Sequence, residues 1–439
     1  MKKFISVLFN LFVFVSMVSA VRAQVNTKYD ILLKGGHVID PANNINSIMN
    51  VAVADGKIAR IDTSIPASEA KKVIDVSGYY VTPGLIDIHV HCFHNSPVKS
   101  YQISVIADHH HFSSGVTTVV DAGTSGADTF ESFKEVIDRS KVRILAFLNI
   151  AAPGMGPAEM EPPEFNVKRA VETAKKYPDN IVGFKTAHYF EISTKRRFDA
   201  AHPPWASVDS VLVAARLAGL PVMYDAHPKP PEGGYPARSL RELLLEKMRP
   251  GDIFTHIFYR GFPVVDKNGM VNPDVFKARE RGVVFDIGHG QAAFAFKYAI
   301  PAIKQGFPPN SISTDLHIGN VNGPVLNMAN VMSKFLNIGM TIEDVIQCST
   351  TNPAKTINRP ELGNLSVGST ADIAVLKVLT GDFGYTDCGR GKIKGDKKIQ
   401  CALTLFGGKV VFDISGISYP LWQDIPKDDR YWQRPPQEW

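Results

Sequence analysis

Short apolar runs alternate with helical segments through the middle of the chain. In the segments between the runs, apolar residues recur every three to four positions, which is typical of amphipathic helices, as in Thr129–Arg139, Val208–Ala218 and Leu240–Lys247. Eight strand and helix units over roughly 270 residues match the size of a (β/α)₈ barrel. An open doubly wound sheet is the competing arrangement, but it would carry a glycine-rich phosphate loop after its first strand, and none is present there. The eight predicted strands are Leu85–His91, Val116–Asp121, Val142–Ile150, Ile181–Tyr189, Pro221–His227, Asp252–Phe258, Gly282–His289 and Ser311–His317.

Both ends of the chain carry β-strand patterns without helices between them. Near the start, Met49–Val53 leads to an Asp-Gly turn and then to Lys57–Ile61, which predicts a hairpin. Near the end, Ala371–Leu376 and Thr404–Phe412 have the same character. Either end alone has too few apolar residues to form a hydrophobic core, so we expect the two ends to pair into one small β-sandwich.

The first residues resemble a secretory signal. Lys2 and Lys3 precede the short apolar run Phe4–Val18, and small residues that suit cleavage follow it. The run is short for a membrane span, so a permanent anchor is the weaker alternative. We therefore expect an exported, most simply periplasmic, protein. The predicted division is a signal peptide at 1–23, a first β-sandwich segment at 24–82, the barrel at 83–358, a second β-sandwich segment at 359–415 and a C-terminal tail at 416–439.

Composition excludes some partners. The chain has 439 residues and a formal net charge of +5, which is too small for its length to indicate nucleic-acid binding. The four cysteines fit no zinc-knuckle spacing. Unpaired thiols are the expectation, and a disulfide between Cys388 and Cys401 is the alternative in an oxidising compartment. Once the leader is removed, no stretch suits a membrane. The tail is rich in tryptophan and proline and can wrap the barrel or a neighbouring subunit. A homo-oligomer is therefore an alternative to a monomer.

The stretch from Val81 to His94 carries the first candidate chemistry. It begins at a Pro-Gly turn and continues as a strand that places Asp87, His89 and His91 on one face. Two imidazoles on one strand face can bind one metal ion, and Zn²⁺ accepts neutral histidine readily. Two polar residues on a wet sheet face are the alternative when the pair is read alone.

Polar residues also end the other predicted strands. Active sites of barrels lie at the carboxyl edge of the strands, so these residues should converge on one mouth. They are Lys185 and His188 on the fourth strand, Asp225 and His227 on the fifth, His256 on the sixth, Asp286 and His289 on the seventh, and Asp315 and His317 on the eighth.

Three of these residues suggest specific roles. Lys185 sits in an apolar strand, where it must pair with an acid or lose its charge; as a neutral amine it can add carbon dioxide and form a carbamate. His256 is either a metal ligand or a satisfied core histidine. Asp315 is either a helix cap or a general base and acid beside a metal-activated water.

Taken together, these residues resemble the amidohydrolase superfamily, and the resemblance is closest to its dihydroorotase-like amidohydrolase and deacetylase branch. Further segments fit that branch: Gly115–Gly123, Phe285–Gly290, Ser313–His317, Asn352–Lys355 and Gly363–Ala374. The resemblance implies a distorted (β/α)₈ (TIM) barrel with a zinc centre, two ions or one. His89, His91 and Asp315 would hold one ion, carbamylated Lys185 would bridge, and His256 with a residue of the fifth strand would hold the second. A hydroxide bridging the ions would attack an amide or ester carbonyl, with Asp315 as general base and then acid.

The fifth strand departs from the family pattern. The usual ligand there is a histidine, and here Asp225 occupies its place with His227 two residues later. Both side chains share a strand face, so His227 stays open as the alternative to Asp225. A carboxylate would bring the ligand charge to neutrality against two Zn²⁺, which makes the second ion less electrophilic or changes the preferred metal.

His289 and His188 are the candidate substrate-binding residues. By resemblance, His289 would bond a substrate carbonyl or carboxylate, with a buried structural histidine as the alternative. The expected activity is hydrolysis of a non-peptide C–N amide bond in a small molecule, of the N-acyl or N-acetyl deacetylase type. A cyclic amidase of the dihydroorotase or hydantoinase type, with a basic loop at Lys195–Arg197, and an acetyl esterase are the alternatives. A non-enzymatic hydantoinase-like scaffold is disfavoured because the ligand residues remain.

Overall fold

Seven parallel strands form the curled sheet at the centre of the larger lobe of the molecule. The computed structural model describes residues 27–98, 103–190, 195–262 and 264–425. The sheet order is β12-β11-β10-β9-β8-β7-β6, so each strand pairs with its neighbour in sequence. The strands are β6 (Leu85–Val90), β7 (Val116–Gly126), β8 (Arg143–Asn149), β9 (Ile181–Thr186), β10 (Val222–Tyr224), β11 (Ile253–Phe254) and β12 (Val284–Phe285).

Residues 311–316 occupy the eighth position without forming a continuous strand. A parallel bridge joins Ser311 to Asp286 beyond β12, and another joins Leu316 to Val90 at the end of β6. The N–H of His91 also donates to the carbonyl of Leu316, at 3.0 Å. These contacts connect the last strand of the sheet to the first, so the fold is of the TIM-barrel type that the strand and helix pattern predicts.

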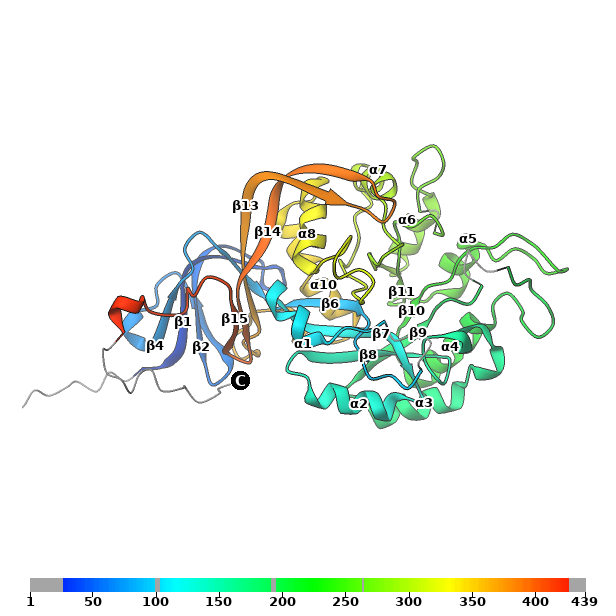
Figure 1. The fold of residues 1–439 in the computed structure, drawn as a ribbon, viewed down its shortest axis with the longest axis horizontal. Coiled ribbons are helices and arrows are strands. Elements are labelled where there is room, and N and C mark those ends of the chain that lie inside the picture. Colours follow the sequence, from blue (N-terminus) through cyan, green and yellow to red (C-terminus); the bar gives the residue numbers. More distant parts are fainter. Residues whose placement is uncertain (1–26, 99–102, 191–194, 263, 426–439) are drawn as a thin grey trace, which may run out of the picture.

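Helices cover the outside of this barrel and connect its strands (Figure 1). α2 and α4 begin and end close to the predicted bounds, and each presents an apolar face to the sheet. The predicted helix at Leu240–Lys247 is a short α5 that continues as one π-helical stretch, Leu243–Lys247. The helices are α1 (Ala107–His110), α2 (Phe130–Arg139), α3 (Val167–Lys176), α4 (Ala206–Ala218), α5 (Leu240–Glu242), α6 (Pro273–Glu280), α7 (Phe296–Lys304), α8 (Met328–Asn337), α9 (Ile342–Gln347) and α10 (Thr351–Thr356).

Strands from both ends of the chain form a second, eight-stranded sheet. Its order is β15-β14-β13-β5-β1-β2-β3, and β4 also pairs with β1. β5 is the junction, because it lies parallel to β1 and antiparallel to β13. The predicted pairing of the two ends is therefore correct, whereas the second layer of a β-sandwich and the exact domain bounds stay predictions. The strands are β1 (Tyr29–Asp40), β2 (Ile45–Ala54), β3 (Lys57–Asp62), β4 (Ala70–Asp75), β5 (Tyr80–Pro83), β13 (Ile373–Thr386), β14 (Lys392–Phe406) and β15 (Lys409–Asp413).

Two strands of this sheet extend far beyond it. β13 and β14 form a long hairpin that passes over α8 and reaches α7 (Figure 1). The hairpin predicted at the other end also forms: Ala54 pairs with Lys57, and Asp55 and Gly56 both have positive φ.

Several expectations concern features outside the barrel. All four cysteines are free thiols. Within the described residues of the chain, no helix is long and apolar enough to cross a membrane. The predicted signal peptide at 1–23 lies outside the described residues, as does the tail from 426 onward.

Candidate functional site

Most of the predicted ring of polar side chains lines one cavity at the carboxyl edge of the barrel strands, whereas His227, Asp286 and His289 do not line it. Its volume is about 120 Å³, or roughly four times the volume of a water molecule in the liquid. The lining residues are His89, His91, Ile103, Ala122, Met155, Lys185, Ala187, His188, Asp225, His256, Asp315 and His317.

The protonation of His89 follows from its hydrogen bonds. Thr255 Oγ1 donates its single hydrogen to Asp286 Oδ2, at 2.8 Å. The same hydroxyl lies 3.0 Å from Nδ1 of His89 and must therefore accept from it. Nδ1 carries the proton, so Nε2 of His89 has a free lone pair for a metal ion.

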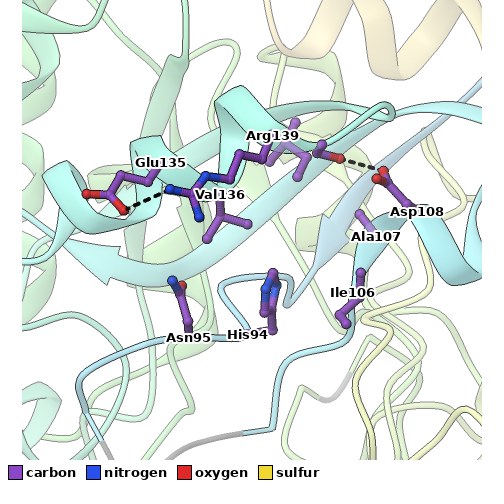
Figure 2. A pocket seen from close by; sticks show the side chains of 10 residues that line it. His94, Asn95, Ile106, Ala107, Asp108, Glu135, Val136 and Arg139 are labelled. Atoms are coloured by element: carbon purple, nitrogen blue, oxygen red, sulfur yellow. Dashed lines mark hydrogen bonds and ion pairs between the residues drawn. The ribbon is translucent and has the colours of Figure 1, made fainter. Parts of the chain in front are cut away.

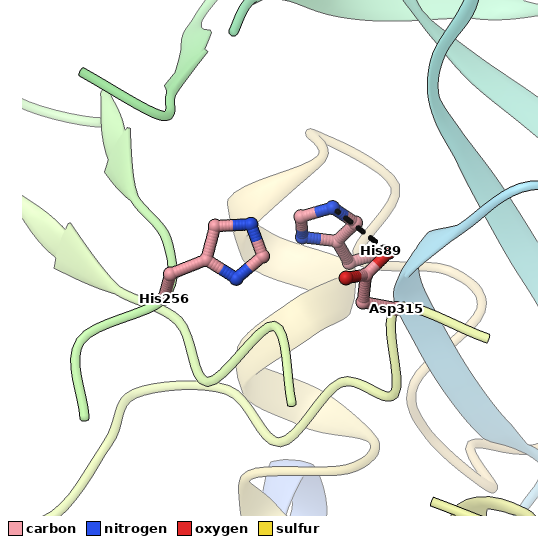
Figure 3. A group of neighbouring side chains, drawn as sticks. All are labelled: His89, His256 and Asp315. Carbon is pink, nitrogen blue, oxygen red and sulfur yellow. Dashed lines mark ion pairs between the residues drawn. The ribbon is translucent and has the colours of Figure 1, made fainter. Parts of the chain in front are cut away.

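His256 is oriented in the same way. Its Nδ1 donates to the carbonyl of Gly288, at 2.6 Å, because a carbonyl only accepts. Nε2 of His256 then also has a free lone pair, and the rings of His89 and His256 lie 4.9 Å apart between centroids. Figure 3 shows the two rings next to each other, with the carboxylate of Asp315 beside His89. One donor atom from each of these three residues lies within 4.8 Å of the others.

His91 and Asp315 complete this side of the cluster. Nε2 of His91 lies 3.1 Å from Oδ1 of Asp315, and Nδ1 of His91 is 2.8 Å from Thr124 Oγ1. The backbone of Asp315 has φ +49°, which is the left-handed region. Its N–H donates to the carbonyl of His89, and its carbonyl accepts from Nδ2 of Asn320 at 2.7 Å. Burial by itself would raise the pKa of Asp315, but His91, His256 and His317 lower it below its ordinary value.

Lys185 lies inside the same cluster. It is the last residue but one of β9, its exposed fraction is 2%, and its Nζ lies 3.4 Å from Nε2 of His89. Burial lowers the pKa of Lys185, while Asp225 and Asp315 oppose that shift. Gly123 makes room for this side chain, because a Cβ there would lie 2.7 Å from Cβ of Lys185.

Asp225 lies between two histidines, one residue beyond β10. Its Oδ1 is 3.4 Å from Nε2 of His227, and its Oδ2 is 3.6 Å from Nε2 of His256. Although burial would raise the pKa of Asp225, His256, His227 and Lys185 lower it well below its usual value. His227 packs against Phe262, with 4.7 Å between ring centroids, and does not line the cavity.

These donors fit a metal ion. Oδ1 of Asp225 and Oδ1 of Asp315 are buried and accept no hydrogen bond, although imidazole nitrogens lie 3.4 and 3.1 Å away. Buried carboxylate oxygens are normally satisfied, and unsatisfied ones next to imidazole nitrogens are typical of an ion site. Nitrogen and oxygen donors of this kind suit Zn²⁺ and similar divalent cations.

The two predicted substrate-binding histidines lie in different surroundings. His188 lines the cavity, and its Nδ1 is 2.7 Å from Oε2 of Glu159. His289 is fully buried, its Nδ1 donates to the carbonyl of Gly290, and its Nε2 accepts from Nζ of Lys334 at 2.7 Å. His289 does not line the cavity, and its role toward a substrate stays a prediction.

The sequence did not indicate three residues that support the site. Thr255 sets the protonation of His89, and Asn320 binds the carbonyl of Asp315. Glu159, with an exposed fraction of 2%, binds Nδ2 of Asn149 and the N–H of Gly156 in addition to His188. Glu159 lies in a short 3-10 helix, Pro157–Met160, whose sequence has no periodic pattern, so its burial has no signal in the sequence.

A second cavity, of about 200 Å³, lies beside α2 (Figure 2). Its charged residues serve local structure: Arg139 pairs with Glu135 on the surface of α2, and Asp108 accepts from the backbone N–H groups of Lys141 and Val142. No group of metal-ligating side chains meets there among the described residues.

Comparisons with known proteins point to one enzyme family. The family model described as "Amidohydrolase family" matches residues 80–220 and 296–411, more than half of the chain. The protein named Deacetylase Atu3266 from Agrobacterium fabrum is 34% identical over 348 residues, which cover 76% of this chain and 79% of that protein. A deacetylase from Enterococcus faecalis is 28% identical over 391 residues, or 87% of this chain and 99% of that protein.

Solved structures agree on the fold. A crystal structure described as an adenine deaminase matches with a TM-score of 0.77 at 28% identity, over 88% of this chain and 100% of that chain. One described as a dihydroorotase matches with a TM-score of 0.72 at 29% identity, over 87% and 99%. The barrel, the ligand cluster and the sequence match lead to one conclusion: this chain belongs to the amidohydrolase family.

Proposed function

We propose that this protein is a metal-dependent hydrolase that removes an acyl group, in the simplest case acetyl, from a nitrogen atom of a small molecule. The observation that carries the proposal is the cluster of His89, His256 and Asp315, whose donor atoms lie within 4.8 Å of one another. The relatives named deacetylase support the same reaction class. A cavity of about 120 Å³ suits a small acyl group.

The proposed ligands are His89, His91, Lys185, Asp225, His256 and Asp315. Asp225 is favoured over His227 because it lines the cavity, whereas the ring of His227 packs against Phe262. Zn²⁺ bound there would polarise the scissile carbonyl and lower the pKa of a water molecule. The number of ions is open, since a carboxylate at the fifth strand leaves less positive charge than a histidine would.

Lys185 is proposed to carry a carbamate. Burial lowers the pKa of its amine, and a neutral amine can add carbon dioxide with loss of one proton. The resulting anion would offset the charge of the cations held by the neighbouring histidines. It would also remove the need to bury an ammonium 3.4 Å from Nε2 of His89.

Asp315 is proposed to transfer the proton. Its carboxylate can accept a proton from the attacking water and then give it to the leaving nitrogen. The histidines around it keep its pKa low, so the carboxylate is ionised and able to accept. His188, oriented by Glu159, lines the same cavity and is the proposed contact for the substrate carbonyl or an anionic group beside it.

A substrate comparison tests the proposal. The protein, purified without chelators, is assayed with a series of N-acetylated amino acids, with acetyl esters, and with dihydroorotate and hydantoin. We expect hydrolysis in the first series, and its loss in Lys185→Ala. Turnover of the cyclic compounds without any N-acetyl substrate would reject the deacetylase proposal. A cyclic amidase would use the positive charge of the basic loop to bind a ring carboxylate. Part of that charge is already paired, because Arg196 lies 2.7 Å from Glu161.

Export belongs to the proposal and rests only on the leader pattern of residues 1–23. Expression with and without these residues, followed by the mass of the product in each cell fraction, tests it. A cytoplasmic product of full mass would reject export.

A further inference from the structure

Lys334 is a buried lysine that takes no part in the proposed reaction. It lies on α8, is completely inaccessible to solvent, and its Nζ has three acceptors. These are Nε2 of His289 at 2.7 Å, the carbonyl of Pro324 at 2.8 Å and the carbonyl of Thr386 at 2.8 Å. An ammonium group has three hydrogens, so each hydrogen has one acceptor in a different segment of the chain.

Two of these segments contact Asp315. His289 precedes Gly290, and a Cβ at Gly290 would lie 2.4 Å from Oδ2 of Asp315, so the backbone of this loop packs directly against the carboxylate. Pro324 belongs to the loop that contains Asn320, whose Nδ2 donates to the carbonyl of Asp315. Lys334 therefore connects both loops that hold Asp315.

The third segment is the end of the long hairpin of β13 and β14. Beyond Thr386, Asp387 and Cys388 form the end of the hairpin that touches the barrel, here called the hairpin tip. Oδ2 of Asp387 accepts from the N–H of Phe296 at 2.9 Å, and the N–H of Cys388 donates to the carbonyl of Phe294 at 3.0 Å. Sγ of Cys388 lies 3.4 Å from the carbonyl of Gly290. Figure 1 shows β13 and β14 crossing α8 to reach α7.

Asp315 needs such support because of its backbone. A residue other than glycine at φ +49° is strained, and this conformation persists only where the surroundings determine it. Its N–H is bonded to the carbonyl of His89 on β6, its carbonyl is bonded to Asn320, and its carboxylate packs against Gly290. Lys334 joins the two loops that contain Asn320 and Gly290. Displacement of either loop would turn the carboxylate.

We propose that Lys334 and the hairpin tip are positioning residues for the carboxylate of Asp315, so that the small sheet contributes to the geometry of the barrel site. This inference rests on the proposed function, in which Asp315 transfers the proton. Lys334 and the hairpin tip then have a role in turnover although they do not contact the substrate. They act on Asp315 only through the two loops.

The first test is Lys334→Met, which removes three donors and keeps most of the side-chain volume. With N-acetyl amino acids we expect kcat to fall by about 10- to 100-fold while KM changes less than about twofold, since small misplacements of a reacting group have effects of this size. The matched control is Lys394→Met, because Lys394 is an exposed lysine on β14 of the same hairpin. The control should match the wild type in both constants.

A second readout does not depend on activity. The protein is loaded with Co²⁺, and its visible absorption spectrum reports the arrangement of the ligands, including Asp315. We expect the spectrum of Lys334→Met to shift while that of Lys394→Met does not. Should Lys334→Met fail to fold, Cys388→Ala and Asp387→Asn replace it; both alter only the hairpin tip, and a smaller change in the same direction is expected.

The outcomes separate the two proposals. Wild-type kcat and wild-type Co²⁺ spectra in all tip variants, with only a lower unfolding temperature, would overturn the positioning role. If the wild-type protein hydrolyses none of the N-acetyl substrates, the proposed function fails, and the Co²⁺ spectra alone still decide whether Lys334 positions Asp315.

Discussion

The carboxylate of Asp315 has neighbours that keep it charged and leave one of its oxygens unsatisfied. In Asp315→Asn the amide cannot accept a proton, so we expect kcat to fall by at least about 100-fold, in line with the usual size of general acid–base effects. At least one metal ion should remain, held by the histidines. Metal analysis and kcat of the same preparation are the measurements, and Asp396→Asn, an exposed aspartate on β14, is the control. A variant with wild-type kcat would show that another group moves the proton.

Asp225 and His227 compete for one ligand position, and their surroundings differ. Asp225 has an unsatisfied buried oxygen and lines the cavity, whereas His227 packs between aromatic rings. We expect Asp225→Ala to lower the number of metal ions bound per chain, and His227→Ala to leave that number closer to the wild type. Elemental analysis of both variants decides, and the reverse order would make His227 the ligand.

His111 gives a pH-dependent stability that is unrelated to the metal site. It is buried beside α1, its Nδ1 donates to the carbonyl of Ala107, and burial lowers its pKa from 6.5 to about 4. The unfolded chain takes up a proton near pH 6.5, but the folded chain does so only near pH 4. The neutral, buried His111 therefore contributes its full share to the free energy of unfolding above pH 6.5. This contribution, up to about 3 kcal/mol, is lost as the pH falls toward 4.

His111→Asn keeps a donor for Ala107 and removes the titration. We expect its free energy of unfolding, measured by urea denaturation between pH 7.5 and 4.5, to fall less with acid than that of the wild type. His109→Asn, at an exposed position of the same helix, should keep the wild-type slope. Equal slopes for wild type and His111→Asn would contradict the assignment.

At the scale of elements, a glycine of β7 leaves space for a side chain of β9. Gly123 has φ +85° and lies against Lys185 of β9. Gly123→Ala should displace Lys185 and lower both metal occupancy and kcat by about 10-fold or more. Gly251 also has φ +85° but faces open space, so Gly251→Ala has the same backbone strain without the collision. If both variants lose the same activity, strain alone explains the effect.

Strand periodicity predicted where the site residues lie along the chain but not how the backbone presents them. The predicted strands through His188, His227 and His256 are too long, since β9, β10 and β11 end at Thr186, Tyr224 and Phe254. His188 and His256 have positive φ just past the ends of β9 and β11, and Asp315 has positive φ in the irregular eighth segment; this conformation re-aims their side chains. Period-two patterns contain no information about such residues, because the surrounding loops impose the strain.

Hydrogen-bond partners that lie far apart in the sequence could not be predicted either. Lys185 and His256 were found because each interrupts an apolar strand, and Asp315 because it is the only acid at the end of the eighth predicted strand. Thr255, Asn320 and Glu159 act through hydrogen bonds that only the folded loops create. Residue type and spacing therefore indicated the candidate ligands, whereas the groups that orient them required the structure.

For the whole molecule, one ion pair joins the barrel to the second sheet. Nη1 of Arg143, on β8, lies 2.6 Å from Oδ2 of Asp372 and also donates to Thr118 Oγ1. Asp372 is 3% exposed, so Arg143→Met would leave its carboxylate buried with the backbone N–H of Gly407 as its remaining partner. We expect the free energy of unfolding to fall by about 2 kcal/mol, measured by urea denaturation, with little change in KM. Arg139→Met, an exposed arginine on α2, is the control, and an equal loss in both would contradict the role of the pair.

The position of β5 has a consequence for biosynthesis. This strand leads directly into β6 and its two histidines, yet one edge of β5 is covered only by β13, where Thr82 faces Ala374. The ribosome synthesises Ala374 long after Thr82. In every nascent chain, this edge of β5 therefore stays unpaired while the barrel strands emerge. Contacts of such long sequence separation slow folding, and the final strands must arrive before the first ones are protected from aggregation.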